Sequence, residues 1–269
     1  MSTLQLAVEK CGNNGYCPPS TDTFIFKPFF TFDVGSVHFI VNRLTTMLFF
    51  GVLLIVAFFW AAFRNPKLVP GKMQWAGESA YNFIRDGVAR EVIGPEGVRF
   101  APYLTVLFSF VFVMNFYGIL PGAQVPVTGR IAYPAVLAVI SLVIFNYVGI
   151  RRQGARKYFK DNLFPPGVPV GMYIILTPIE ALSTFIVRPF TLAVRLFANM
   201  FGGHLLLLVF FTGTAYLLTV GNFSIVFSPI TFIMSIVLTA FELLVEALQA
   251  YIFTILTAVY VSGALAEEH

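Results

Sequence analysis

Uncharged, apolar stretches alternate with short charged ones along this chain. Residues 44–63 carry no charge, and about 20 residues at about 1.5 Å each span the hydrocarbon core of a bilayer as a helix. Two further stretches are similar in length, and Pro121-Gly122 ends the first of them. The pattern therefore predicts membrane-crossing helices at 39–63, 100–120 and 131–150.

The last two apolar stretches, 171–211 and 225–265, are about twice as long. As single helices each would measure about 60 Å, roughly double the hydrocarbon thickness. Each therefore either crosses the membrane twice or forms one steeply inclined helix. Only Gly202-Gly203 offers a weak break after Arg195. We therefore favour two long, strongly tilted helices packed as a hairpin.

The segment 66–99 differs from these spans because charged residues are frequent in it. Within it, Ala76, Ala80, Ile84 and Val88 recur every four residues, which is the spacing of one helix face. This predicts an amphipathic helix lying in the membrane interface. It is either a docking site for a partner helix or a surface connector, and the sequence does not separate the two.

Composition agrees with a membrane protein. Apolar residues make up 58% of the 269 positions and charged residues 11%, whereas a soluble domain has about 25% charged residues. We expect an all-α membrane protein with a tail at 1–37 and one membrane domain at 38–269. The sequence has no nucleotide-binding loop, nucleophile constellation or metal-ligand spacing. We therefore expect no catalytic residue, cofactor or metal, and no nucleic-acid partner.

Loop charge predicts the orientation in the membrane. The loops 64–99 and 151–160 together hold eleven Lys and Arg, against three on the opposite side. Basic loops face the cytoplasm, so five spans place the N-terminus outside and the C-terminus inside. Cys11 and Cys17 lie in the outer tail. They form a disulfide there or remain free thiols.

Arg195 is the most unusual residue of the long apolar stretches. An arginine keeps its charge at any working pH, and at the centre of a membrane helix it costs about 2.5 to 3.5 kcal/mol. It cannot relay protons, but it can hold a nearby carboxylate ionised. At about 100° per residue, a polar stripe lies within about 60° of Arg195, while His204 falls on the opposite side. The stripe comprises Glu180, Thr184, Arg188, Thr191 and Asn199.

A second polar stripe lies on the last apolar stretch, where Glu242, Glu246 and Gln249 fall on one side. Such a stripe at membrane depth faces protein or water rather than lipid. Carboxyl and imidazole groups exchange protons, so Glu242, Glu246 and His204 indicate a proton path. The alternative is a structural network that only fastens two helices.

Two motifs in these stretches resemble subunit a of the F-type rotary ATP synthases. They are Arg195-Leu-Phe-Ala-Asn199-Met-Phe-Gly-Gly-His204 and the run that begins at Gln249 and continues Ala-Tyr-Ile-Phe-Thr-Ile-Leu-Thr-Ala-Val-Tyr. The likeness is close from about 170 to 269 and extends in layout to the earlier spans. It implies a proton-conducting stator subunit of a bacterial plasma membrane, with a ring of c subunits and b-type stalk subunits as partners.

The resemblance also implies roles for single residues. Arg195 would face the c-ring and separate two half-channels, and Asn199 and Gln249 would flank the proton path. His204 and Glu242 look like a family pair with its members exchanged, and Glu246 is an additional carboxyl. Glu180 resembles the acid of the exit channel, but it lies one residue further from Arg195 than is common. A local helix bulge would restore its register.

Two rival functions remain at this stage. A self-contained transporter could use Arg195 to bind an anionic substrate, and it would be active in vesicles on its own. A structural scaffold would use its polar stripes only to join helices. In that case Arg195→Ala and Glu242→Gln would leave a working assembly.

Overall fold

The structure is a computed structural model that describes residues 29–34, 37–120, 126–164, 170–220 and 226–265. Cys11, Cys17 and the last four residues lie outside this part of the chain. The elements, with 3-10 and π helices both written η, are as follows: β1 Phe30–Val34, β2 Val37–Val41, α2 Arg43–Phe63, α3 Lys72–Ile84, η2 Arg85–Ile93, η3 Pro95–Phe100, α4 Ala101–Phe116, η4 Val127–Gly129, α5 Ala132–Gln153, α6 Ala155–Leu163, η5 Val170–Met172, α7 Tyr173–Leu182, η6 Ser183–Val187, α8 Arg188–Val220 and α9 Ser228–Leu265.

Five helical runs in the described part of the chain are long and apolar enough to cross a membrane, which confirms the predicted all-α class. The runs are Arg43–Phe63, Pro95–Phe116, Ala132–Gln153, Tyr173–Leu218 and Ser228–Leu265. The fourth and fifth have 46 and 38 residues and are each continuous. Each long apolar stretch is therefore one long helix rather than two short spans. Their inclination in a membrane stays a prediction.

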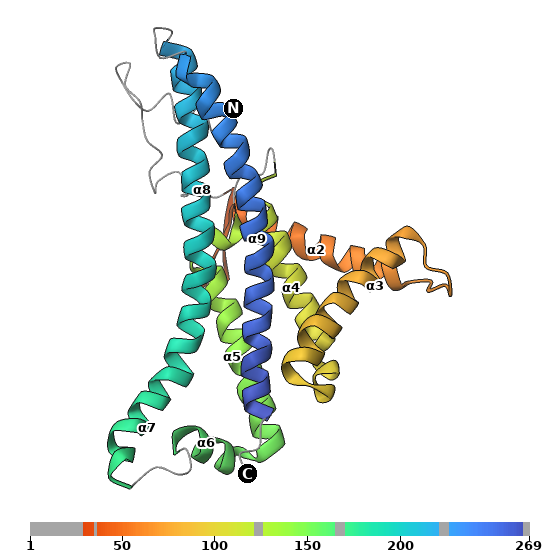
Figure 1. Cartoon of the computed structure of the whole chain (residues 1–269), viewed down its shortest axis with the longest axis vertical. Helices are drawn as coiled ribbons and strands as arrows, with labels where there is room; N and C mark the ends of the chain where they lie inside the picture. The colour runs from red at the N-terminus through yellow and green to blue at the C-terminus, as the bar shows by residue number, and fades with distance from the viewer. Residues whose placement is uncertain (1–28, 35–36, 121–125, 165–169, 221–225, 266–269) are drawn as a thin grey trace.

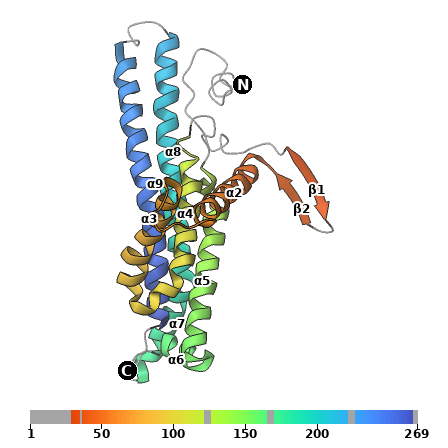
Figure 2. The same cartoon turned by 90° about the vertical axis from the view of Figure 1, so that its right-hand side faces the viewer.

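The chain enters the first span through a short β-hairpin. Strands β1 and β2 pair antiparallel, from Phe30 opposite Val41 to Val34 opposite Val37, and the hairpin stands away from the helices (Figure 2). The predicted span began at residue 39, but the helix begins at Arg43 because β2 occupies the preceding residues. Asn42 caps the helix, since its Oδ1 accepts the Thr45 N–H at 3.0 Å.

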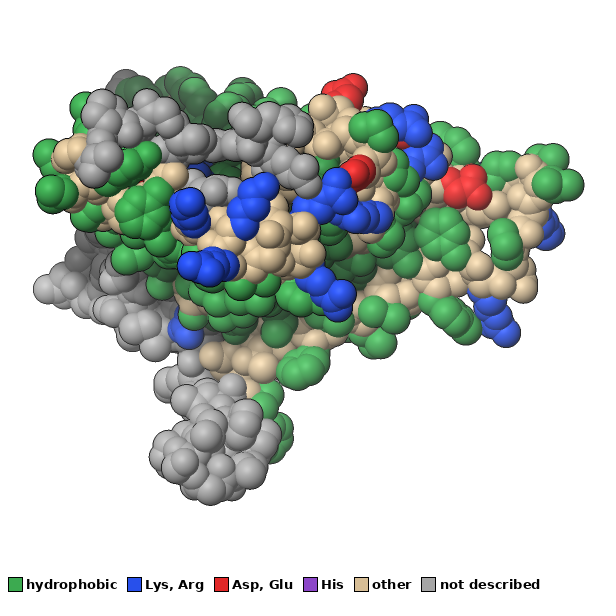
Figure 3. Space-filling view, turned by 90° about the horizontal axis from the view of Figure 1, so that it is seen from below, with side chains coloured by type: hydrophobic (Ala, Val, Ile, Leu, Met, Phe, Trp, Pro, Cys, Tyr) green, Lys and Arg blue, Asp and Glu red, His purple; other side chains and the backbone are tan. Residues whose placement is uncertain are grey.

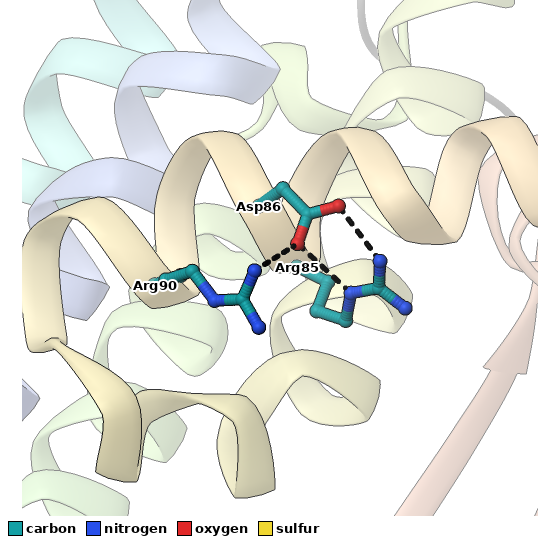
Figure 4. A network of polar contacts seen from close by, with 3 residues as sticks. All are labelled: Arg85, Asp86 and Arg90. Atoms are coloured by element: carbon teal, nitrogen blue, oxygen red, sulfur yellow. Dashed lines mark hydrogen bonds and ion pairs between the residues drawn. The ribbon is translucent and has the colours of Figure 1, made fainter.

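The charged segment 66–99 forms α3, η2 and η3. The predicted apolar side is present, because Ile84 and Val88 are fully buried against α4 and α9. The single expected helix is divided, however, since Arg85–Ile93 adopts π geometry. Its polar side carries an ion-pair network in which Asp86 binds Arg85 at 2.8 Å and Arg90 at 3.5 Å (Figure 4).

Helices α8 and α9 pack side by side as a hairpin, with α4 and α5 against them (Figures 1 and 2). The central core cluster comes from all four helices, and Leu196 of α8 and Ala250 and Phe253 of α9 are almost fully buried in it. The outer faces are strongly apolar, as Phe232, Phe241 and Leu244 on α9 illustrate. Exposed apolar side chains of this kind suit a lipid environment.

A π segment joins α7 to α8. Pro189 has no N–H group, so the carbonyl group of Phe185 loses the donor that an α-helix would supply. Residues Ser183–Val187 adopt π geometry at this place. A π segment accommodates one extra residue, which is the bulge expected between Glu180 and Arg195. In Figure 1, α7 diverges from α9 whereas α8 lies alongside it.

Basic side chains gather at the end of the molecule that carries α6 (Figure 3). They are exposed, and they come from the last turn of α5 and from α6: Arg151, Arg152, Arg156, Lys157 and Lys160. Arg152 also pairs with Glu96 of η3 at 3.3 Å. Tyr158 of α6 is buried, and its hydroxyl donates to Asn146 Oδ1 of α5 at 3.1 Å.

Candidate functional site

The polar stripe predicted on the last helix is buried inside the protein. Glu242, Glu246 and Gln249 of α9 are 5%, 2% and 3% exposed. They recur at helical spacing, so all three side chains lie on the side of α9 that packs in the bundle. The opposite side of the same turns is apolar and exposed, with Leu243 and Leu244.

A side-chain hydrogen bond joins the two long helices beside these carboxyl groups. Asn199 Nδ2 of α8 donates to Gln249 Oε1 of α9 at 2.8 Å. This places the two predicted amide residues in direct contact. Because both amides also border a pocket, the bond fixes the relative position of the helices at the site itself.

The pocket lies between α4, α8 and α9 and has a volume of about 380 Å³. Its polar lining consists of Glu242, Glu246, Gln249, Asn199 and Asn115, and the remaining residues are apolar or glycine. Glycines leave room for the carboxyl groups. A Cβ on Gly203 would lie 3.1 Å from Glu242 Oε1, and one on Gly118 would lie 3.1 Å from Glu246 Oε1.

Several polar atoms around the pocket are buried without a hydrogen-bond partner among the described residues. They are both carboxyl oxygens of Glu242 and of Glu246, Gln249 Nε2 and Asn115 Nδ2. Buried polar groups of this kind are normally satisfied by protein or by water. A space of this size with five polar side chains in its lining can hold several water molecules. The arrangement therefore suits the binding and transfer of protons.

Arg195 does not line the pocket itself, but it lies on the side of α8 that carries Asn199 and Gly202, which do. Its side chain is exposed in the isolated chain, as are Thr191 and Asn199 of the same predicted stripe. Within the described residues no carboxylate forms an ion pair with it. The remaining members of the stripe are less exposed: Arg188 and Glu180 are half-buried and Thr184 is buried. Arg188 lies over the Tyr260 ring at 5.5 Å.

His204 is buried at 5% exposure, on the side of α8 away from Arg195, as the helical spacing predicts. It does not line the pocket itself, where Gly203 is the residue next to Glu242. Glu180 lies on α7, beyond the π segment η6, and also apart from the pocket. Of the seven predicted site residues, the pocket brings together Glu242, Glu246, Asn199 and Gln249.

Sequence reasoning missed Asn115 and Thr128. Asn115 lies in the last turn of α4 and is fully buried, and Thr128 of η4 donates from Oγ1 to Asn115 Oδ1 at 2.6 Å. An asparagine inside an uncharged span was the available signal. No group of three His, Cys, Asp or Glu side chains in the described ranges is placed to hold a metal ion.

Comparison with known proteins agrees with this arrangement. The family model described as ATP synthase A chain matches residues 44–262. The chain is 50% identical to ATP synthase subunit a of Frankia alni over 259 residues, covering 96% of this chain and 89% of the relative. It is 45% identical to that of Streptomyces lividans, with 95% and 90% covered, and 44% identical to that of Rhodococcus erythropolis, with 98% and 96% covered. The chain therefore belongs to the ATP synthase A chain family.

Proposed function

We propose that this protein is the proton-conducting stator subunit of a bacterial F-type ATP synthase. In this role it forms two half-channels that carry protons to and from carboxyl groups on a rotating c-ring. It is a non-catalytic subunit, and the proton is its only small-molecule substrate. The observation that carries the proposal is the position of Arg195: a permanent cation on an open face of α8, one turn from the Asn199–Gln249 bond at the pocket.

Arg195 separates the two half-channels. Neighbouring residues on its face, Ala198 and Gly202, are small and exposed, and small residues allow membrane helices to approach closely. A ring helix that packs there brings its carboxyl group to the guanidinium group. Because Arg195 has no acidic partner within the described residues, that incoming carboxylate becomes its counter-ion. The cation therefore drives release of the proton and blocks its passage along the stator.

The pocket provides the outer half-channel. Its two carboxyl groups, on Glu242 and Glu246, lie one helical turn apart, so a proton can pass between them through water. His204 serves the same channel from the buried side of α8. The Asn199–Gln249 pair borders this pocket, and Asn199 lies one turn from Arg195 on the same side of α8, so the pair links the channel to the face that carries Arg195. These are the positions that proton transfer toward the ring requires.

Glu180 serves the cytoplasmic half-channel. Without a bulge it would lie about 60° from Arg195 to one side, and the extra residue of η6 turns it by about 100°, to about 40° on the other side. Glu180 thus stays on the Arg195 side of the helix. It also lies toward the end of the molecule that carries the basic α6, which is the end we assign to the cytoplasm.

The remaining assignments follow from the same orientation. The exposed basic residues of α5 and α6 face the cytoplasm, as loop charge favours, which puts the N-terminal tail outside. The α3–η2 segment lies in the cytoplasmic interface and is the docking face for b-type stalk subunits. The exposed apolar side chains of α2 and α9 contact membrane lipid or the ring.

The test is ATP-driven proton pumping in membranes that contain the assembled complex with Arg195→Ala or Arg195→Lys. We expect both variants to abolish coupled pumping, since lysine lacks the delocalised fork and loses its proton when it is buried. Lys157→Ala, which removes an exposed cation of α6, is the control and should pump normally. Normal pumping by either Arg195 variant would exclude this function and favour a structural scaffold.

A further inference from the structure

The carboxyl group of Glu246 lies in a recess that exists because residue 118 is glycine. A Cβ at Gly118 would lie 3.1 Å from Glu246 Oε1 and 2.7 Å from Met200 Cε. The first distance is tighter than ordinary van der Waals contact, and the second is a clash. Any other residue at 118 would therefore push Glu246 or Met200 away. The same point lies 3.2 Å from the backbone carbonyl oxygen of Asn115, so Asn115 borders the recess.

The side chain of Asn115 is held in one orientation. Thr128 Oγ1 donates to Asn115 Oδ1 at 2.6 Å, and both residues are fully buried. Because the Thr128 hydroxyl group binds the Asn115 amide oxygen, the N–H groups of this amide point away from Thr128 and can donate to another partner. Asn115 also lines the pocket that holds Glu246. Its Nδ2 is buried and has no partner among the described residues, so it is a donor that the pocket has to satisfy.

We propose that Thr128 and Asn115 are positioning residues for Glu246. Thr128 fixes the amide, Asn115 presents its Nδ2–H group to the Glu246 carboxyl group directly or through one water, and Gly118 keeps the recess open. The opposite amide orientation would turn an oxygen toward the carboxylate, and two acceptors repel each other. This inference rests on the proposed function, because Glu246 needs positioning only if protons pass through the pocket.

The test compares two variants of Thr128 in membranes with the assembled complex. Thr128→Val removes the hydroxyl and keeps the shape, whereas Thr128→Ser keeps the hydroxyl. Passive proton flux through the membrane sector is measured per assembled subunit, so that a lower yield of complex does not count as slower conduction. We expect Thr128→Val to lower flux about five- to tenfold, in line with the loss of one hydrogen bond between uncharged side chains, and Thr128→Ser to stay near the wild type.

A double-mutant comparison separates positioning from general packing. In a Glu246→Gln background the carboxylate is gone, so adding Thr128→Val should cause no further loss of flux. Gly118→Ala should likewise lower flux on its own and cause no further loss in the Glu246→Gln background. Its control is Gly171→Ala, since a Cβ on Gly171 meets nothing within 4 Å.

Wild-type flux in Thr128→Val, or an equal additional loss in the Glu246→Gln background, would overturn this inference. The outcome is distinct from failure of the proposed function. If Arg195→Ala abolishes pumping while Thr128→Val conducts normally, only the positioning role is lost. If Arg195→Ala pumps normally, both proposals are lost.

Discussion

Asn199 of α8 donates a hydrogen bond to Gln249 of α9 at 2.8 Å, fifty residues away along the chain. This bond joins the helix that carries Arg195 to the helix that carries both buried carboxyl groups. Hydrogen bonds between membrane helices contribute about 0.6 kcal/mol on average and up to about 1.7. The bond therefore contributes only modestly to the stability of the helix pair. Its larger effect is to hold the two helices in a defined position at the site.

The first prediction exchanges these two side chains. Asn199→Gln lengthens one of the two bonded side chains by one methylene group, and Gln249→Asn shortens the other by one. Each change alone should therefore slow pumping. The double exchange restores the combined length and should recover a substantial part of the rate. Pumping is measured in membrane vesicles. If the double variant pumps as slowly as the slower single variant, the Asn199–Gln249 hydrogen bond does not determine the pumping rate.

The second prediction concerns His204 and Glu242. If both serve one path, blocking either closes it, so His204→Ala together with Glu242→Gln should be no worse than the more damaging single change. Losses that multiply would place the two residues on separate paths. Passive proton flux is the suitable measurement because it does not depend on ATP hydrolysis.

The third prediction tests the additional carboxyl group. Glu246→Gln keeps the size of the side chain but cannot bind and release a proton, and we expect flux to fall about tenfold or more. Glu96→Gln is the matched control, because Glu96 is an exposed residue of η3. An unchanged flux in Glu246→Gln would remove this residue from the proton path.

The fourth prediction concerns the anchoring of α6. The Tyr158 ring packs directly on Gly149, and a Cβ there would overlap the ring. Gly149→Ala should therefore displace the ring, break the bond from Tyr158 to Asn146, and destabilise this region by about 1 to 3 kcal/mol. Limited proteolysis of α6 should become faster. Gly171→Ala, which meets nothing within 4 Å, should show no change.

The fifth prediction is a pH dependence outside the membrane spans. The hydrogen bond from Arg85 lowers the pKa of the Asp86 carboxyl group. A lowered folded-state pKa stabilises the fold above the ordinary carboxyl range and loses this effect as pH falls through the folded value. Asp86→Asn should therefore lower the Tm slightly at neutral pH, by about one degree or less for so exposed a pair. At strongly acidic pH the two proteins should melt alike.

The hydropathy pattern predicts five long apolar helical runs, which the described part of the chain contains, and helical periodicity predicts which side of α9 is buried. The hydropathy pattern and the helical periodicity are each carried by many residues, so an atypical residue at one position does not change the prediction. The helix predicted to begin at residue 39 overlaps the strand Val37–Val41, because a short apolar run suits either structure. The division of α3 from η2 was also missed, since periodicity does not distinguish α from π geometry.

The pocket could be predicted only in part. Glu242, Glu246 and Gln249 share a helix, and their spacing reveals them. Asn115 comes from another helix and is oriented by Thr128 across a loop, so no periodic signal connects it to the carboxyl groups. The recess at Gly118 depends on how closely α4, α8 and α9 approach, which is a property of three-dimensional packing.

The π segment Ser183–Val187 divides one long helix into two parts with independent rotational phase. Deleting a single residue within it would convert the segment to ordinary α-helix and swing Glu180 by about 100° around the axis while Arg195 stays in place. An insertion or deletion at this junction would therefore redirect the exit route proposed for Glu180 without turning the face of α8 that carries Arg195.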